Sequence, residues 1–311
     1  MGNYVLTTDC STDLTADLRE RFGVDDYCHT ITITYPDGHT QDAGLDWDDQ
    51  TPQDFYSSMS RKALLKTGFC SLADQEAFFE KHLAAGNDIL HITISSGLSG
   101  TYQNCLNAAN NLKDKYPDRK IYVVNSLRYS GGTGLLTSIA GDMKKAGKSI
   151  EEVYEWCEAN KKRIRQMGTV DDLIFLMHSG RVKGAAAVMG SLINIKPMAD
   201  FDGTGVSLVI GKTKGYPNLL KATIEYMKRT GEDLANQRIF VCCTNRKAQS
   251  TQLAQMINDE FHPAEVIETF VNKSNGANIG PGMLVAFYLG KEVEDDLSDV
   301  KEVVADIVEN L

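Results

Sequence analysis

Strand-like and helix-like segments alternate through the first half of the chain, and this pattern restricts the fold more than any other. Short apolar runs at Tyr4–Thr7, Ile89–Ile94 and Ile121–Val124 have the composition of strands, and each leads into a segment with helical character. The helical pattern is clearest at residues 72–85. Alternating strands and helices form a mainly parallel sheet with helices on both faces. We therefore expect an α/β fold in this half of the chain.

The second half of the chain is organised differently. Two strand patterns, Lys196–Phe201 and Val206–Ile210, flank the turn sequence Asp202-Gly203-Thr204-Gly205, which predicts an antiparallel hairpin. A helix at 216–229, a strand at 238–243 and a helix at 246–261 follow. We therefore expect a two-domain protein with an α+β second domain. The expected boundaries are 1–148 for the N-terminal α/β domain, 149–290 for the C-terminal α+β domain and 291–311 for an acidic amphipathic helix.

The C-terminal segment repeats apolar residues at intervals of three and four, which places them along one face of a helix. The rest of this segment is acidic. One interpretation is that the helix packs on its own domain, and the other is that the apolar face contacts a second subunit or a partner. The face consists of Leu297, Val300, Val303, Val304, Ile307, Val308 and Leu311.

Composition argues against several classes of protein. A net charge of −10 over 311 residues, without a basic stripe, argues against a nucleic-acid-binding protein. The seven cysteines are odd in number and lack metal-ligand spacing, so we expect reduced thiols, no zinc site and no cofactor. No apolar run reaches the ~18 residues of a membrane-spanning helix. The N-terminus does not resemble a signal peptide, and we expect a soluble cytoplasmic protein.

One strand ends in two serines and continues directly into a helix that has glycines at its start. The sequence there is Ser95-Ser96-Gly97-Leu98-Ser99-Gly100-Thr101. Unpaired backbone N–H groups at a helix start, together with the positive end of the helix dipole, attract anions. Ser96 and Ser99 add hydroxyl donors, and Gly97 allows a ligand to approach the backbone closely. The segment predicts a site for a carboxylate or a phosphate, with helix capping as the alternative.

Familiar catalytic motifs are incomplete in this chain. The run Gly97-Leu98-Ser99-Gly100-Thr101 ends in threonine where the Gly-x-Ser-x-Gly elbow of serine hydrolases requires glycine. The segment ending in Gly147-Lys148-Ser149 misses a phosphate-binding P-loop by one residue and follows a helix. A serine- or aspartate-dependent hydrolase of a small carboxylate or phosphoester stays open as an alternative. Ser96 or Ser99 would be its nucleophile with Asp9 nearby, although no histidine is an evident base.

Five segments together resemble one protein family in their order and spacing. They are Thr7-Thr8-Asp9-Cys10-Ser11-Thr12-Asp13-Leu14, Lys66-Thr67-Gly68-Phe69-Cys70-Ser71, Ser95-Ser96-Gly97-Leu98-Ser99-Gly100-Thr101-Tyr102-Gln103, the stretch from Asp171-Asp172-Leu173 through Ser179-Gly180-Arg181-Val182 to Lys196-Pro197, and Gly276-Ala277-Asn278-Ile279-Gly280-Pro281-Gly282. The family is the DegV family, the fatty-acid-binding subunits that serve bacterial fatty acid kinase. The resemblance spans about residues 3–290.

The resemblance implies that one long-chain fatty acid lies between the two domains. Its carboxylate would be at the serine-rich helix start, and its acyl chain would enter an apolar tunnel formed by the C-terminal domain. By position, Ser96 would bind the carboxylate, with Ser99 and nearby amides such as that of Gly97 beside it, and Thr67 would complete the clamp. A separate ATP-dependent kinase subunit would convert the carboxylate to an acyl phosphate. The protein would then be a carrier without enzymatic activity of its own.

Three positions bear on how far the resemblance extends. Asn278 stands where the family usually has histidine, and asparagine can donate a hydrogen bond but cannot become charged. The sequence Gly68-Phe69-Cys70 replaces the Ser-Gln-Pro that usually follows the threonine. Arg181 matches the arginine of the Ser-Gly-Arg motif, and it would face the phosphate or the docked kinase, or brace the junction between the domains.

The walls of the tunnel are expected among apolar residues of the second half. Burial of about fourteen methylenes is worth roughly 11 kcal/mol before ordering costs, so the tunnel would set the affinity and the hydroxyls the head-group identity. A third interpretation is a small-ligand sensor or an interaction protein that uses the C-terminal helix. The wall candidates are Val188, Met189, Leu192, Ile193, Ile195, Met283, Val285 and Phe287.

Overall fold

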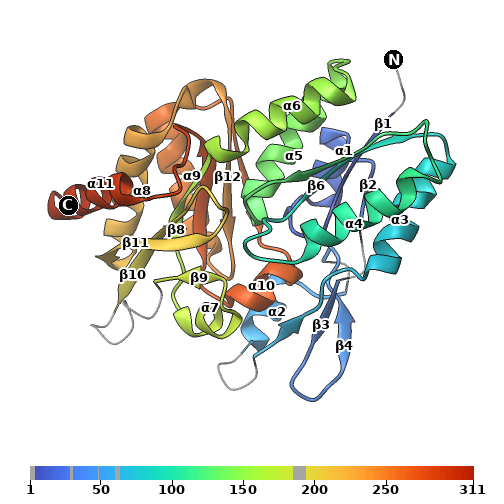
Figure 1. The fold of residues 1–311 in the computed structure, drawn as a ribbon. Helices are drawn as coiled ribbons and strands as arrows, with labels where there is room; N and C mark the ends of the chain where they lie inside the picture. Colours follow the sequence, from blue (N-terminus) through green and yellow to red (C-terminus); the bar gives the residue numbers. More distant parts are fainter. Residues whose placement is uncertain (1–3, 29–30, 48, 60–63, 185–193) are drawn as a thin grey trace.

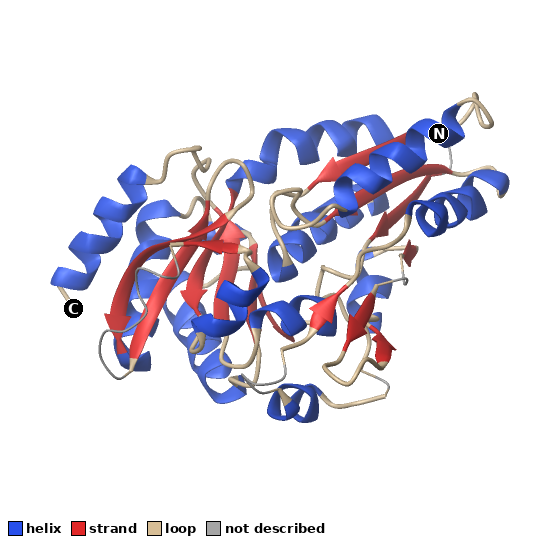
Figure 2. Cartoon of the chain, turned by 60° about the horizontal axis from the view of Figure 1, so that its bottom comes forward, coloured by secondary structure: helices blue, strands red, loops and turns tan. Residues whose placement is uncertain are grey.

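The computed structural model describes residues 4–28, 31–47, 49–59, 64–184 and 194–311, and it contains two large sheets that lie beside each other (Figures 1 and 2). The first sheet has the strand order β2-β1-β6-β7, and all its described pairings are parallel. The parallel sheet expected from the alternating pattern is therefore confirmed. Its strands are β1 (Tyr4–Thr8), β2 (Asp26–Tyr27), β6 (Asp88–Thr93) and β7 (Ile121–Asn125).

Helices cover both faces of this sheet because each strand connects to the next through a helical segment. α3 and α4 pack together against β6 and β7, whereas α1, α5 and α6 belong to the core on the other face. The helices are α1 (Ala16–Phe22), α3 (Leu72–Ala84), α4 (Thr101–Lys113), α5 (Ser130–Lys145) and α6 (Ile150–Asn160), and the short 3-10 helix Lys161–Arg163 follows α6.

A small antiparallel sheet with its own apolar cluster inserts between β2 and α3. Its strands are β3 (Thr32–Thr34), β4 (Thr40–Asp42) and β5 (Lys66–Thr67), and α2 (Pro52–Ser58) precedes β5. Helix α2 begins at the cap residue Thr51, whose hydroxyl accepts a hydrogen bond from the backbone N–H of Asp54. The insertion places Thr67 at the end of β5, in contact with the C-terminal half of the chain through α10 (Lys273–Ile279).

The second large sheet is mixed, with the strand order β13-β12-β14-β8-β10-β11-β9. The hairpin expected from the turn sequence is present, since β10 and β11 pair antiparallel. The strands are β8 (Ile164–Thr169), β9 (Val182–Lys183), β10 (Ile195–Phe201), β11 (Ser207–Lys214), β12 (Arg238–Cys243), β13 (Glu265–Phe270) and β14 (Leu284–Leu289). The helices of this half are α7 (Leu173–Ser179), α8 (Gly215–Thr230), α9 (Lys247–Phe261), α10 and α11 (Ser298–Glu309), with a 3-10 turn at Leu234–Asn236.

Helix α5 joins the two sheets, because it contacts β1 and β6 of the first and β8, β12 and β14 of the second. Glycine at position 141 lets α5 approach the end of α1 closely, since a Cβ there would overlap the carbonyl oxygen of Phe22. Helix α6 packs against β6 and β7 of the first sheet, although the expected boundary assigns its residues to the second domain. The boundary at residue 148 therefore stays a prediction.

The C-terminal helix α11 packs against α8 and β11 within the same chain, at one edge of the molecule (Figure 1). Val300, Val304 and Ile307 are buried in this contact, and the side chain of Val304 lies against Gly211 of β11. The apolar face of the helix thus packs on its own half of the protein, as the first interpretation stated. Within the described ranges, no helix combines the length and apolar character needed to cross a membrane.

Candidate functional site

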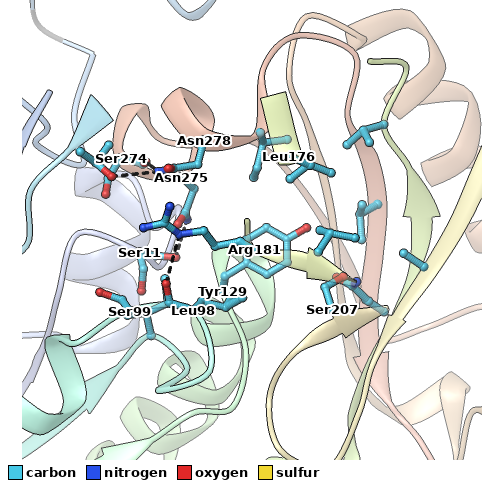
Figure 3. A pocket seen from close by; sticks show the side chains of 18 of the residues that line it. Ser11, Leu98, Ser99, Tyr129, Leu176, Arg181, Ser207, Ser274, Asn275 and Asn278 are labelled. Carbon is cyan, nitrogen blue, oxygen red and sulfur yellow. Dashed lines mark hydrogen bonds between the residues drawn. The ribbon is translucent and has the colours of Figure 1, made fainter. Parts of the chain in front are cut away.

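A cavity of about 120 Å³ lies where the first sheet, the small sheet and the second sheet meet (Figure 3). The loops after β1 and β6 line it on one side, and α7 and α10 line it on another. Exposed Phe69 and Arg181 mark its rim, whereas Gln166 and Ser207 belong to its buried interior. The cavity therefore lies between the two halves of the chain, where the sequence predicted a ligand.

One face of the second sheet forms much of the inner wall. In β10 and β11 the lining residues are alternate ones, because successive side chains of a strand point to opposite faces, whereas at the end of β8 Thr169 also lines the cavity. Most of these side chains are apolar or small. The residues are Gln166, Gly168 and Val170 in and after β8, Pro197 and Ala199 in β10, Ser207 and Val209 in β11, and Val285 in β14.

Polar side chains from the small sheet and from α10 meet at one end of the cavity. The Nδ2 of Asn278 donates to the Oγ1 of Thr67 at 3.0 Å and to the carbonyl oxygen of Ser274 at 3.1 Å. The structure thus brings together two residues that the sequence predicted for the same clamp. Asn275 of the same helix also lines the cavity, and its Nδ2 donates to the carbonyl oxygen of Ser11.

The serine-rich loop after β6 contributes Ser99 and Thr101 to the cavity, with their hydroxyl oxygens 2.9 Å apart. Ser96 and Gly97 are not among the residues that line it, which differs from the expectation. The Ser96 hydroxyl instead accepts a hydrogen bond of 2.7 Å from the Nδ2 of Asn125 at the end of β7.

Gly97 is kept out of the cavity by a close contact with the hairpin turn of the second half. A Cβ at this position would lie 2.8 Å from a methyl carbon of Val206 and 2.9 Å from the carbonyl oxygen of Gly205. The glycine is therefore needed for the approach of two protein segments. The sequence predicted a close approach of a ligand to Gly97, whereas the structure places a protein segment there.

Arg181 extends over the cavity from the segment after α7, with its side chain between Ser99 and Ser207 in the view of Figure 3. Its Nε donates to the carbonyl oxygen of Leu98 at 3.4 Å, and its Nη1 donates to the carbonyl oxygen of Ser179. Among the described residues, no carboxylate forms an ion pair with this guanidinium. An arginine remains charged at all physiological pH values, so an anion at the rim would find a cation there.

Asp9 lines the cavity at the end of β1 and is almost completely buried. Its carboxylate accepts hydrogen bonds from the backbone N–H of Ile94 at 2.8 Å, from the backbone N–H of Ser11 at 2.9 Å and from the Ser11 hydroxyl. Burial raises the pKa of Asp9 above its ordinary value, because desolvation outweighs these hydrogen bonds. The carboxyl group therefore fixes the two loops that carry the polar residues of the site.

Asp13 connects both halves of the chain beneath the cavity. Its carboxylate accepts hydrogen bonds from the Ser130 hydroxyl at the start of α5, and from the backbone N–H and Nδ2 of Asn272 at 2.9 and 2.6 Å. Asn272 is the cap residue of α10, the helix that carries Asn278. Burial raises the pKa of Asp13 to about 7 despite these hydrogen bonds.

Of the tunnel-wall residues predicted from the sequence, one of the four that the structure describes lines the cavity. Val285 lines the cavity, whereas Ile195, Met283 and Phe287 are not among the lining residues. The ring of Phe287 packs under the first turn of α5 and against Tyr129, which draws it into the core. The other four candidates, Val188, Met189, Leu192 and Ile193, lie outside the described residues.

Several lining residues were not anticipated from the sequence, above all Tyr129, Gln166 and Ser207. Ser207 lies in a predicted strand, so alternation with Val209 could have identified it. The described lining residues include no histidine, and the described part of the chain has no group of three or more His, Cys, Asp or Glu side chains able to hold a metal ion.

Comparisons with known proteins identify the family of this chain. The family model described as "Uncharacterised protein, DegV family" matches residues 4–291. A DegV domain-containing protein of Clostridium perfringens is 30% identical over 297 residues, which cover 94% of this chain and all of that protein. Another relative, from Streptococcus pyogenes, is also 30% identical and covers 73% of this chain and 78% of its own length.

Solved structures share the fold. A fatty-acid-binding DegV family protein from Thermus thermophilus has a TM-score of 0.81 at 24% identity, covering 92% of this chain and 99% of that chain. The fatty acid kinase (Fak) B3 protein of Streptococcus pneumoniae, loaded with linoleic acid, has a TM-score of 0.78 at 21% identity, covering 93% of this chain and 100% of that chain. By its sequence match over most of its length, this chain belongs to the DegV family.

Proposed function

We propose that this protein binds a long-chain fatty acid in the cavity and presents its carboxylate to a separate ATP-dependent fatty acid kinase. The observation that carries the proposal is one continuous cavity with a polar, cationic rim and a largely apolar inner wall. An amphipathic ligand matches both parts. The carboxylate would lie near Thr67, Ser99 and Asn278, with Arg181 above it, and the acyl chain would follow the face of the second sheet.

The relatives support the same ligand class. Structures of family members from Thermus thermophilus and Bacillus subtilis are described as fatty-acid-binding, a protein of Eubacterium ventriosum is described as stearic-acid-binding, and a DegV family protein of Eubacterium eligens is loaded with heptadecanoic acid. The name of the Streptococcus pneumoniae protein links that relative to a fatty acid kinase. A kinase partner for this chain is inferred from that link and from the exposed position of Arg181 at the rim, where a docked protein could reach the carboxylate.

The two parts of the site have different energetic roles. Each buried methylene contributes about 0.8 kcal/mol, so the acyl chain supplies most of the binding free energy. A hydrogen bond to a charged group contributes about 1.5–3 kcal/mol, which is enough to orient the head group but not to hold the lipid alone. We therefore expect changes at the rim to affect phosphorylation more strongly than lipid retention.

A hydrolase is the second candidate, and the geometry does not favour it. Ser99 would be the nucleophile, but its hydroxyl is paired with that of Thr101, and no histidine is among the described lining residues. Asp9 is the one carboxyl group on the described wall, and backbone N–H groups and Ser11 already occupy its oxygens. A positioned base is needed to activate serine, and the lining residues that the structure describes supply none for Ser99.

Mass spectrometry of the purified protein tests the proposal directly. The intact protein is measured under native conditions, and the bound lipid is then extracted and identified. We expect close to one fatty acid per chain. A protein that is empty and also fails to bind added stearic acid would refute the proposal and leave only the fold.

Two matched serine variants test the head-group assignment. Ser99→Ala removes a hydroxyl from the cavity wall, whereas Ser96→Ala removes one that is bound to Asn125 outside it. With a fatty acid kinase and ATP, we expect Ser99→Ala to retain lipid but to form acyl phosphate at least about tenfold more slowly, as the loss of one charged hydrogen bond implies. Ser96→Ala should stay near wild-type. The reverse order would show that the ligand approaches the loop from its other side.

A further inference from the structure

The inner wall of the cavity contains one polar pair among apolar neighbours. Gln166 of β8 is 1% exposed, and its Nε2 donates to the Ser207 hydroxyl across a long 3.4 Å. The Oε1 of the same amide has no hydrogen-bond partner. Both residues line the cavity, together with Gly168, Ala199 and Val209.

This arrangement is unfavourable when only protein groups are considered. Buried polar atoms in proteins are almost always paired, and an unpaired one costs free energy comparable to a lost hydrogen bond. An unsubstituted alkyl chain packed against Gln166 would leave the Oε1 atom unpaired, because such a chain offers neither a donor nor an acceptor. A hydroxyl group could donate to Oε1 and accept from Ser207 at the same time.

The pair lies away from the end of the cavity where the carboxylate is proposed. Ser207 is on the opposite side of the cavity from Ser274 and Asn278 in Figure 3. An oxygen at this place would belong to the acyl chain and not to the head group.

An unpaired amide is not by itself a sign of a ligand, as a second glutamine of this protein shows. Gln75 of α3 is also completely buried, and neither its Oε1 nor its Nε2 has a partner. It is not among the residues that line the cavity, so no ligand can reach it there. The position of Gln166 on the cavity wall is what distinguishes the two residues.

We propose that the preferred ligand is a fatty acid that carries a hydroxyl group on its acyl chain, recognised by Gln166 and Ser207. The proposal rests on the fatty-acid-binding function proposed above and narrows its ligand class. The amide and the hydroxyl would make this protein select an oxygenated chain over a plain one of equal length. Gln166 and Ser207 would thus determine specificity, while the rim residues bind the carboxylate common to both.

A binding comparison tests the proposal. Delipidated protein is titrated in a calorimeter with stearic acid, with a hydroxystearic acid substituted at the middle of the chain and with one substituted near the methyl end. We expect one of the hydroxylated acids to bind about tenfold more tightly than stearic acid, as one added hydrogen bond with relief of an unpaired amide implies. In Gln166→Leu this preference should fall to within about twofold, with stearic acid binding retained or improved.

The controls separate the possible failures. Gln75→Leu makes the same replacement at a buried glutamine outside the cavity, and it should keep the preference. If Gln166→Leu does not fold, Ser207→Ala serves in its place and should reduce the preference. Wild-type protein that binds stearic acid at least as tightly as both hydroxylated acids overturns this inference but leaves the fatty-acid function standing. Failure to bind any of the three acids overturns the proposed function itself.

Discussion

Replacement of Asp13 by asparagine should change how the stability of this protein depends on pH. Burial raises the pKa of Asp13 from 3.8 to about 7 in the folded state. The folded protein therefore holds this proton more tightly than the unfolded chain, and the resulting stabilisation is complete below about pH 4. It is lost progressively as the pH rises, and it is gone above about pH 7. The carboxyl is fully buried, so solvent screening does not reduce the effect.

The size of the effect follows from the shift. Three pKa units correspond to about 4 kcal/mol of differential stability. Asparagine cannot titrate, and it suits the backbone because residue 13 has a φ of 54°, in the left-handed region that asparagine tolerates. The variant loses one acceptor for the donors of Ser130 and Asn272, so it should be less stable overall. Its stability should nevertheless vary less steeply between pH 4 and 7.

Urea unfolding followed by far-ultraviolet circular dichroism measures this difference. The free energy of unfolding is determined at several pH values from about 4 to 8 for both proteins, and the variant is subtracted from the wild type. We expect this difference to fall by about 4 kcal/mol from the acidic to the neutral end and then to level off. The exposed Asp114→Asn is the control for removal of one carboxylate and should show a flat difference. Parallel curves for Asp13→Asn and wild type would refute the reasoning.

Other consequences of the packing can be measured as changes in unfolding free energy. Gly141→Ala should destabilise the protein by about 1–3 kcal/mol, because the added Cβ overlaps the carbonyl oxygen of Phe22; unchanged thermal unfolding would show that α5 can shift without cost. Val304→Ala should lower the free energy of unfolding by about 1–2 kcal/mol, because it truncates a buried side chain of α11. The control Glu302→Ala changes an exposed side chain of the same helix and should alter this free energy by less than about 0.5 kcal/mol. Equal effects of the two variants in denaturant titrations would contradict the described packing of α11. Ser149→Ala should lower the free energy of unfolding by about 1 kcal/mol, since it removes one half of the capping box at the start of α6. An unchanged melting temperature in calorimetry would contradict this role of Ser149.

Three strands of the first sheet could be predicted from local patterns because they are short apolar runs that alternate with helices, whereas the two-residue strand β2 (Asp26–Tyr27) has no such pattern. Much of the cavity wall could not be predicted from local patterns. Strand β8 contains Arg165 and Gln166, which do not suggest a strand in the interior of a sheet. The charge of Arg165 is accommodated there by an ion pair of 3.1 Å with buried Asp200, a partner 35 residues away in sequence. Such long-range compensation leaves no local pattern.

For the same reason, the sequence could not show which of Ser96 and Ser99 faces the cavity. The sequence singled out a loop that contributes to the cavity wall, and both residues have equal hydrogen-bonding chemistry. The hydrogen bond from Asn125 and the contact of Gly97 with Gly205 determine which hydroxyl faces the cavity. Both contacts come from other parts of the chain, so a local segment could not indicate its own orientation.

The cavity wall includes residues from Asp9 near the N-terminus to Val285 near the C-terminus. During synthesis on the ribosome, the first sheet can form long before the second sheet is available to close the opposite side. No nascent intermediate that lacks β14 has the complete wall, so under the proposed function a fatty acid would be captured only after almost the whole chain has been made. The bound lipid would then act as a marker of completed folding, and a kinase that recognises only the loaded protein would never engage an unfinished one.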